Sequence, residues 1–235
     1  MDLGIRGKVA LVVGASRSMG RAVAEELLVE GCRVLCVARS ADVPGEGLAL
    51  DLMGAGAVDR LVAWVGDRNP GIIYHALGGS VDGIRDTFSK SEDWAKVWRF
   101  NLGIAIDINN AFLPGMVARK WGRIVHTSSD GIKNSIGNAP YTSSKFAVEG
   151  YVKVASKQFS KDNVIISAVS PGQIYTEGRF VFSQSPEWTQ EYFDKYLPAR
   201  RFGTAQEVAK VVAFLCSEHS AFMPGAIVNI DGASR

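Results

Sequence analysis

Short β-branched apolar runs alternate with stretches of helical periodicity from one end of the chain to the other. A run of four to eight apolar residues bounded by glycine or polar residues predicts a buried strand, and apolar residues three to four apart predict an amphipathic helix. Their regular alternation is typical of βαβ units. We therefore expect an α/β fold with a doubly wound, seven-stranded parallel sheet and helices on both faces. The expected strands are 8–15, 32–39, 47–50, 71–79, 122–129, 164–172 and 226–232. The expected helices are 20–31, 57–67, 91–120 with a bend near Pro114, 139–160 and 206–220.

Length and composition fit one globular domain that spans residues 1–235. The net charge is +2 and basic runs are absent, which argues against nucleic acid and acidic membranes as partners. The first apolar run, Val9 to Val13, is too short for a secretory or membrane segment. We expect a soluble, cytoplasmic protein. Its three cysteines lack metal-ligand spacing, so we predict neither disulfides nor a metal site.

The stretch "VVGASRSMGRAVA" joins the first expected strand to the first expected helix. Gly14, Ser18 and Gly20 occupy positions one, five and seven of its turn. Small residues let the backbone approach a diphosphate, and the helix that follows presents free N–H groups to its charge. Inside a βαβ unit, this loop predicts nucleotide binding rather than a tight turn alone.

Tyr141 and Lys145 lie four positions apart, so both side chains share one face of the expected helix. A free phenol has a pKa near 10, and a neighbouring ammonium favours its ionised form. Such a pair can protonate a carbonyl oxygen while a hydride arrives. On its own the pair is more typical of an ordinary surface turn, so its functional meaning depends on other motifs.

Four motifs in chain order resemble the short-chain dehydrogenase/reductase family. The glycine loop resembles TGxxxGxG, with Val13 in place of the Thr and Ser18 in place of the middle Gly. "GRIVHTSS" resembles the strand that ends in the catalytic serine, "SPGQIYT" resembles PGxIxT, and Asn101 matches the helix asparagine of the family's proton relay. The resemblance covers essentially the whole chain. It implies a single-domain Rossmann fold similar to that of 3-oxoacyl-acyl-carrier-protein reductases.

The resemblance also implies the catalytic roles. Tyr141 would be the general acid/base, Lys145 would lower its pKa and bind the nicotinamide ribose, and Asn101 would hold a water that links Lys145 to solvent. A serine would donate a hydrogen bond to the substrate oxygen. The strand-end motif selects Ser129, whereas the usual thirteen-residue offset to the tyrosine selects Ser128. We favour Ser129, because a one-residue shift would turn the hydroxyl to the other face of the strand.

The end of the second expected strand indicates which dinucleotide is bound. Ala38 stands where a carboxylate would hold the ribose 2′-hydroxyl of NAD, and Arg39 and Arg17 supply guanidinium groups for a 2′-phosphate. We therefore predict NADP(H) rather than NAD. The predicted cofactor-binding residues are Gly14, Ser16, Arg17, Ser18, Met19, Gly20, Ala38, Arg39, Asp51, Leu52, Ala76, Leu77, Gly78, Tyr141, Lys145, Pro171, Gly172, Ile174 and Thr176.

Two local departures from the family pattern carry predictions. Only eleven residues separate Arg39 from Asp51, so we expect the loop "SADVPGEG" in place of a crossover helix. "IIYHALGGS" stands where the family reads NNAG. We expect His75 to replace an asparagine hydrogen bond at the strand end, although a substrate-site base is the alternative.

Residues 173–203 lack clear periodicity and are broken by Pro186 and Pro198. So long an irregular segment in a compact domain is often a lid, which we place at about 177–200. Its aromatic residues favour an apolar or aromatic ketone as substrate, or simply pack the lid onto the core. They are Phe180, Phe182, Trp188, Tyr192, Phe193 and Tyr196.

The predicted function is transfer of a hydride between NADP(H) and a small-molecule ketone or secondary alcohol. The alternatives are an NAD-dependent alcohol or polyol dehydrogenase and a nucleotide-sensing protein on the same fold. The resemblance further implies a homotetramer, or a homodimer, that associates through the helices near 91–119 and 140–160 and through the C-terminal strand.

Overall fold

The computed structural model describes residues 1–132, 138–175 and 186–234, with side chains given from Gln190 onward in the last range. Seven strands form one sheet in the order β3-β2-β1-β4-β5-β6-β7, and every neighbouring pair is parallel. The predicted α/β fold is confirmed. The strands are β1 (Val9–Val13), β2 (Arg33–Ala38), β3 (Glu46–Ala49), β4 (Ile72–His75), β5 (Gly122–Thr127), β6 (Val164–Pro171) and β7 (Ile227–Ile230). The helices are α1 (Ser18–Val29), α2 (Ala57–Val65), α3 (Ser91–Trp98), α4 (Ile104–Ala118), α5 (Ala139–Phe159), α6 (Pro186–Tyr196) and α7 (Ala205–Leu215).

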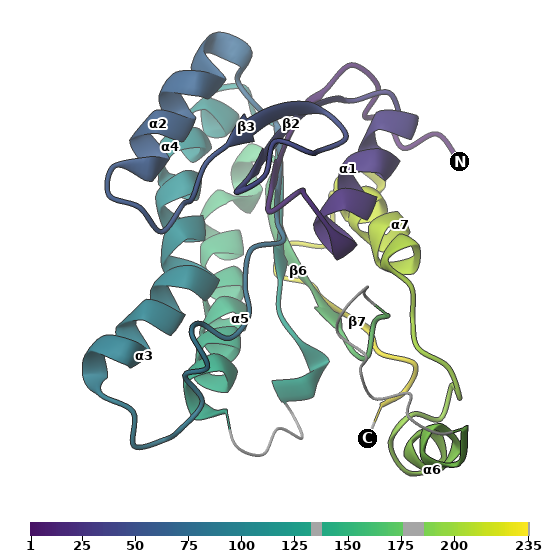
Figure 1. Ribbon diagram of the computed structural model, residues 1–235. Helices are drawn as coiled ribbons and strands as arrows, with labels where there is room; N and C mark the ends of the chain where they lie inside the picture. The colour runs from purple at the N-terminus through teal and green to yellow at the C-terminus, as the bar shows by residue number, and fades with distance from the viewer. Residues whose placement is uncertain (133–137, 176–185, 235) are drawn as a thin grey trace.

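Both faces of the sheet are covered, which explains why the central strands are apolar throughout. Successive strand residues point to opposite faces, so Val12 packs with α1 and α7 while Leu11 packs with α2, α4 and α5. Figure 1 shows these two helical layers on either side of the sheet. Each fully buried Val, Leu or Ile side chain contributes roughly 1.5–3 kcal/mol. No helix of the described residues is both long and apolar enough to cross a bilayer.

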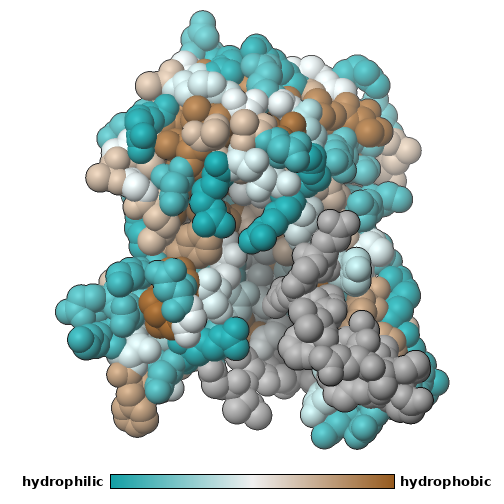
Figure 2. Space-filling model, viewed as in Figure 1, coloured by the Kyte–Doolittle hydropathy of each residue, from teal (hydrophilic) through white to brown (hydrophobic). Residues whose placement is uncertain are grey.

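The strand order reverses between β1 and β4, which are neighbours in the sheet but far apart in sequence. The connections from these two strands leave toward opposite faces, which opens a crevice at their carboxyl ends. Ligands of open α/β sheets bind in such a crevice. In the space-filling view the molecule is hollowed between the α3 side and the α6 side (Figure 2).

The connection from β2 to β3 contains no helix, as predicted. It passes directly over β2, since a Cβ added at Gly45 would lie 2.3 Å from the Val34 carbonyl oxygen. Two ion pairs tie it down: Arg33 with Glu46, at 2.5 Å, and Arg21 with Asp42, at 2.7 Å. The loop is therefore a compact replacement for the crossover helix.

The predicted helix 91–120 is interrupted, but the interruption is not at Pro114. A π-helical turn, η2 (Arg99–Gly103), separates α3 from α4, and Pro114 lies inside α4. The expected bend near Pro114 is thus misplaced by more than ten residues. Single π turns occur often at functional sites, and this one contains the buried side chain of Asn101.

The segment predicted to be irregular, 173–203, contains helix α6, so that prediction is wrong for residues 186–196. Pro186 is the first helical residue, where a missing N–H costs nothing and the fixed φ suits the first turn. A proline can end one helix or begin another, and the sequence around Pro186 does not distinguish the two cases. Phe180 and Phe182 and the side chain of Trp188 lie outside the described part of the chain.

The described aromatic residues of this segment pack on one another. The Phe193 ring lies 5.1 Å from the Phe202 ring, and the Tyr192 ring lies 5.3 Å from the Tyr196 ring, measured between centroids. Figure 1 shows α6 projecting from the body of the molecule, below β7 and near the C-terminus. These rings therefore hold α6 against the segment that leads into α7.

Candidate active site

The loop between β1 and α1 packs against the residues that follow β4. A Cβ added at Gly20 would lie 2.0 Å from the Gly14 carbonyl oxygen and 3.1 Å from the Ala76 side chain, so only glycine fits. The Gly14 N–H donates to Val37 O at 2.8 Å, which ties the loop to the end of β2. The predicted residues Gly14, Gly20, Ala76 and Leu77 are thus brought together at the crevice.

Helix α1 begins at this loop, and its first turn suits an anion. The N-cap residue Arg17 makes no side-chain hydrogen bond to the exposed backbone N–H groups. Uncapped N–H groups at a helix N-terminus attract phosphate. Ser18, the first residue of α1, has φ +51°, the left-handed conformation for which the family uses glycine.

A Ser18→Gly variant is expected to be more stable by about 0.5–1 kcal/mol in its free energy of unfolding. The left-handed conformation costs a residue with a Cβ roughly 1–2 kcal/mol. Glycine removes this cost but makes the unfolded chain more flexible, which offsets part of the gain. Urea titration followed by circular dichroism measures the change. Ser16→Gly, in the same loop but at a position of negative φ, is the control and should lower stability. Equal effects of both variants would contradict the strain assigned to Ser18.

The end of β2 carries positive charge and no carboxylate at the key position. Ala38 is the last residue of β2, and Arg39 and Arg17 are both exposed. Among the described residues neither guanidinium makes an ion pair, whereas the nearby Arg21 is held by Asp42. Two free guanidinium groups beside an uncharged strand end favour a phosphate.

Two of the predicted cofactor-binding residues, Asp51 and Leu52, follow β3. Asp51 accepts a hydrogen bond from the Met53 N–H at 2.9 Å, and Leu52 is buried. The Leu50 N–H donates to Ala38 O at 2.7 Å, which places this turn beside the end of β2. Asp51 and Leu52 therefore lie at the same edge of the sheet as Ala38.

Tyr141 and Lys145 lie in the first two turns of α5, as predicted. The side chain of the N-cap residue Asn138 accepts a hydrogen bond from the Tyr141 N–H at 3.3 Å. Lys145 Nζ lies 5.8 Å from the centroid of the Tyr141 ring and donates to Thr127 O at 2.7 Å. Burial lowers the pKa of Lys145 to about 8, so the side chain is still mainly an ammonium at neutral pH.

Asn101 and Gly78 meet Lys145 at one point. A Cβ added at Gly78 would lie 2.8 Å from Asn101 Oδ1 and 2.8 Å from Lys145 Nζ. The Asn101 amide is bonded to both backbone groups of Gly79, at 2.9 Å each, and donates to Val97 O at 2.9 Å. The turn after β4, the π turn and α5 therefore converge, and any side chain at residue 78 would push them apart.

The two candidate serines differ in their surroundings. Ser128 is 2% exposed, and its hydroxyl donates to Glu149 Oε1 at 2.8 Å, on α5 one turn beyond Lys145. Ser129 is the more exposed of the two. A hydroxyl committed to a carboxylate is a poor donor to a substrate, so the geometry favours Ser129.

The third part of the crevice is formed by the end of β6. A Cβ added at Gly172 would lie 2.7 Å from the Asp231 Cα, so the backbones after β6 and β7 are in close contact. Ile174 forms a parallel bridge with Gly203. Pro171, Gly172 and Ile174 therefore lie at the carboxyl edge with the other predicted residues, while Thr176 lies outside the described residues.

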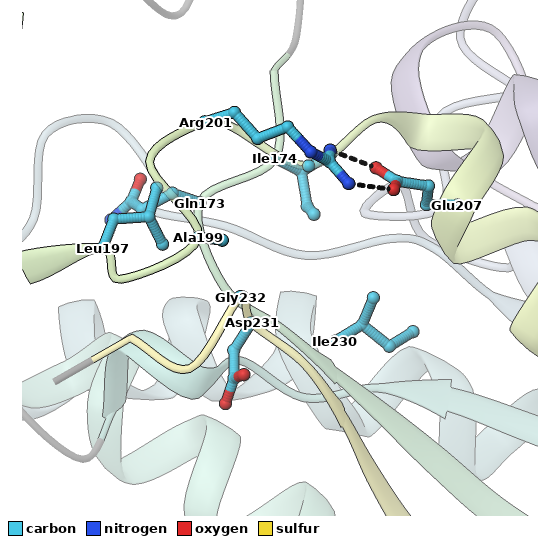
Figure 3. Close-up of a pocket in the computed structure, with 10 residues that line it drawn as sticks. Gln173, Ile174, Leu197, Ala199, Arg201, Glu207, Ile230, Asp231 and Gly232 are labelled. Atoms are coloured by element: carbon cyan, nitrogen blue, oxygen red, sulfur yellow. Dashed lines mark hydrogen bonds and ion pairs between the residues drawn. The ribbon is translucent and has the colours of Figure 1, made fainter. Parts of the chain in front are cut away.

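A small cavity of about 100 Å³ lies under this segment (Figure 3). It is bordered by Ile174, by Leu197 and by the ion pair of Arg201 with Glu207, whose shorter contact is 2.6 Å. None of the predicted catalytic residues lines it. Small-molecule sites typically span 300–1,000 Å³, so this cavity is too small to be the cofactor site.

Two structural partners of the site carried no sequence signal. The acceptor of the Lys145 ammonium is a backbone carbonyl, that of Thr127, and any residue type supplies one. Asn109, on α4, bonds to His75 Nε2 at 2.8 Å. The predicted strand-end hydrogen bond of His75 is therefore confirmed, but its partner lies 34 positions away in the sequence.

Nearly the whole chain is similar to reductases of known type. Residues 14–233 match the family model described as enoyl-(acyl carrier protein) reductase. The 3-oxoacyl-[acyl-carrier-protein] reductase FabG of Aquifex aeolicus is 30% identical over 249 residues, which cover 99% of each chain. The FabG protein of Pseudomonas aeruginosa is 32% identical over 246 residues, which cover 98% of each chain.

Two solved structures extend the comparison. L-sorbose reductase from Gluconobacter frateurii, complexed with NADPH and L-sorbose, has a TM-score of 0.88 at 27% identity and covers 99% of this chain and 98% of its own. A 3-oxoacyl (acyl-carrier-protein) reductase from Agrobacterium tumefaciens C58 with NADP bound has a TM-score of 0.86 at 28% identity. The match covers 98% of this chain and 95% of that one.

Proposed function

The chain belongs to the short-chain dehydrogenase/reductase family, and on that premise we propose that it transfers a hydride between NADP(H) and a ketone or secondary alcohol. The observation that carries the proposal is the buried Lys145 ammonium beside Tyr141 at the crevice. A desolvated cation near a phenol is expensive to maintain in a merely structural turn. Its cost is explained if it stabilises charge on the tyrosine oxygen during a reaction.

The residues of the crevice fit a phosphorylated dinucleotide. The glycine loop admits a close backbone approach at Gly20, the first turn of α1 is uncapped, and Gly78 leaves room beside Lys145. The exposed Arg17 and Arg39 beside Ala38 support the 2′-phosphorylated form. When bound, the nicotinamide supplies or accepts the hydride.

Residues of the chain supply the proton that carbonyl reduction requires. In carbonyl reduction, the Tyr141 hydroxyl gives its proton to the substrate oxygen, and the Lys145 ammonium stabilises the phenolate that remains. Ser129 donates a hydrogen bond to the same substrate oxygen, which stabilises charge that develops there. Asn101 orders the Gly78–Gly79 turn and, in the proposed relay, holds a water that links Lys145 to solvent.

The substrate we propose is a small apolar or aromatic ketone. The support for this choice is the aromatic character of α6 and the segment after it, where Tyr192, Phe193, Tyr196 and Phe202 pack on one another. The relatives include reductases of 3-oxoacyl-acyl-carrier proteins and of L-sorbose, so family membership alone does not identify the substrate.

We propose further that the chain assembles as a homotetramer. Large apolar side chains are exposed on α3 and α5, where Trp98 is 41%, Phe146 51% and Val154 70% exposed. Apolar residues grouped on neighbouring helices are typical of subunit interfaces. Sedimentation equilibrium measures the mass directly, and a monomer at micromolar concentration would contradict this assembly.

Fluorescence titration with NADPH and NADH, followed by turnover of a ketone panel, tests the function. We expect NADPH to bind more tightly than NADH and at least one apolar ketone to be reduced. Absence of binding by both nucleotides would overturn the proposal. Tighter binding of NADH would overturn only its choice of cofactor.

A further inference from the structure

Two histidines are buried behind the candidate site and take no part in the proposed chemistry. His75, the last residue of β4, is 4% exposed, and His126, on β5, is 1% exposed. They are register partners in the sheet, and their rings stack with centroids 4.6 Å apart. Two imidazole rings stacked in a core need hydrogen-bond partners for their nitrogen atoms, and a positive charge on either ring is costly there.

Asn109 on α4 stands between the two rings and is fully buried. Its Oδ1 lies 2.8 Å from His75 Nε2, and its Nδ2 lies 3.1 Å from His126 Nε2 and 3.0 Å from the Tyr151 hydroxyl. An amide oxygen only accepts, and an amide nitrogen only donates. His75 therefore carries its proton on Nε2, whereas His126 Nε2 accepts and its proton is on Nδ1.

Both rings are neutral in this arrangement. Burial lowers the pKa of His75 to about 4. Burial holds the pKa of His126 well below its usual range, and repulsion by a protonated His75 and by the Lys145 ammonium acts in the same direction. A proton added to His126 Nε2 would also oppose the Asn109 amide hydrogens, so charging this ring would break the network.

The network is continuous with the Lys145 ammonium through the strand ends. The Thr127 hydroxyl donates to His75 O at 2.8 Å, so β4 and β5 are joined at their last residues. The Thr127 carbonyl, next to His126 in the chain, is the acceptor of Lys145 Nζ. The two histidines and the acceptor of the Lys145 ammonium therefore belong to the carboxyl ends of the same two strands.

We propose that Asn109 is a positioning residue: its amide fixes His75 and His126 as complementary neutral tautomers, and these hold the Thr127 carbonyl against the Lys145 ammonium. The inference deepens the proposed function, on which its catalytic meaning rests. A hydrogen bond to the charged form of a lysine stabilises that form. Loss of the amide thus makes the ammonium easier to deprotonate.

Other titratable groups near Lys145 have partners of their own or belong to the proposed chemistry. Tyr141 lies on the same helix, and Glu149, one turn further, accepts from Ser128. Asp130, buried in the turn after β5, accepts from the Ser234 hydroxyl. Asn101 and Gly78 present only neutral groups. His75 and His126 are therefore the neighbours whose protonation depends on Asn109.

Imidazole ¹⁵N NMR of the intact protein tests the first half of the proposal. The chain has only three histidines, and the third, His219, is exposed and serves as an internal reference. We expect one buried ring protonated on Nε2 and the other on Nδ1, both unchanged between about pH 5.5 and 8. Two identical tautomers, or a buried ring that takes up a proton within this pH range, would overturn it.

The second half is tested by the ¹³Cε titration of Lys145, assigned with Lys145→Arg. In Asn109→Leu we expect the midpoint to fall by about half a pH unit or more from its value near 8. Asn110→Leu, the exposed neighbour on α4, should leave it unchanged. An unchanged midpoint in a folded Asn109→Leu protein would overturn the proposal.

Asn109→Asp covers the case in which the leucine variant does not fold. It keeps the acceptor for His75 and removes both donors, so His126 Nε2 faces a carboxylate and should take up a proton at neutral pH. A neutral His126 there would count against the network. These measurements need no substrate, so failure of the protein to reduce ketones would leave their outcome intact.

Discussion

A Tyr141→Phe variant is expected to lose about 10²- to 10⁴-fold in kcat for ketone reduction, the range that a positioned general acid contributes. The change removes one oxygen atom and keeps the ring against Lys145. Binding of NADPH should therefore change little, and the loss should lie in kcat. Stopped-flow measurement of NADPH oxidation at saturating ketone determines it.

Tyr196→Phe is the control, since it removes a hydroxyl from α6 while its ring stays with Tyr192. We expect its kcat to stay within about threefold of the wild type, as for surface changes generally. A Tyr141→Phe protein with full turnover would remove Tyr141 from the mechanism. The buried Lys145 would then need another explanation.

Most of the fold could be predicted because the strands are buried on both faces. Near-continuous β-branched runs such as Val9–Val13 and Ile72–His75 are a strong signal when both sides of a sheet are covered. The missing crossover helix was equally readable, since eleven residues between Arg39 and Asp51 are too few for one. Length and pattern settled these elements without tertiary information.

The elements that could not be predicted depend on contacts distant in sequence. The residues of the π turn, Arg99–Gly103, do not differ in type from those of an ordinary α-helix. The turn accompanies the hydrogen bonding of Asn101 to Gly79, which the sequence does not reveal. Helix α6 is polar on average, and its described aromatic residues pack on one another and on Phe202. In both cases tertiary packing outweighs local propensity.

The functional side chains of the candidate site could be predicted from the sequence, whereas the backbone group that binds Lys145 could not. Tyr141 and Lys145 are predictable from their types and spacing, and Asn101 from the family resemblance. The structure brings Asn101 and Lys145 together beside Gly78, with the Tyr141 ring close to Lys145. The acceptor at Thr127 O is invisible in the sequence. Asn109 was missed because an asparagine in a helix is ordinarily solvated, and only the fold shows it between two histidines.

An Ala38→Asp variant is expected to bind NADPH about 100-fold more weakly and to gain affinity for NADH. The new carboxylate would lie where a 2′-phosphate is proposed to sit. Unit charges 4 Å apart repel by about 4 kcal/mol at an effective dielectric constant of 20. Screening by solvent and by Arg17 and Arg39 reduces this, and 100-fold corresponds to about 2.7 kcal/mol.

Ala41→Asp is the matched control, because it adds the same charge to an exposed position in the same loop. Both proteins are titrated with NADPH and NADH by fluorescence, after circular dichroism has shown that they are folded. If the loss came from net charge alone, the two variants would behave alike. If Ala38→Asp bound NADPH as the wild type does, the 2′-phosphate would not lie at the end of β2, and the roles proposed for Arg17 and Arg39 would fail with it.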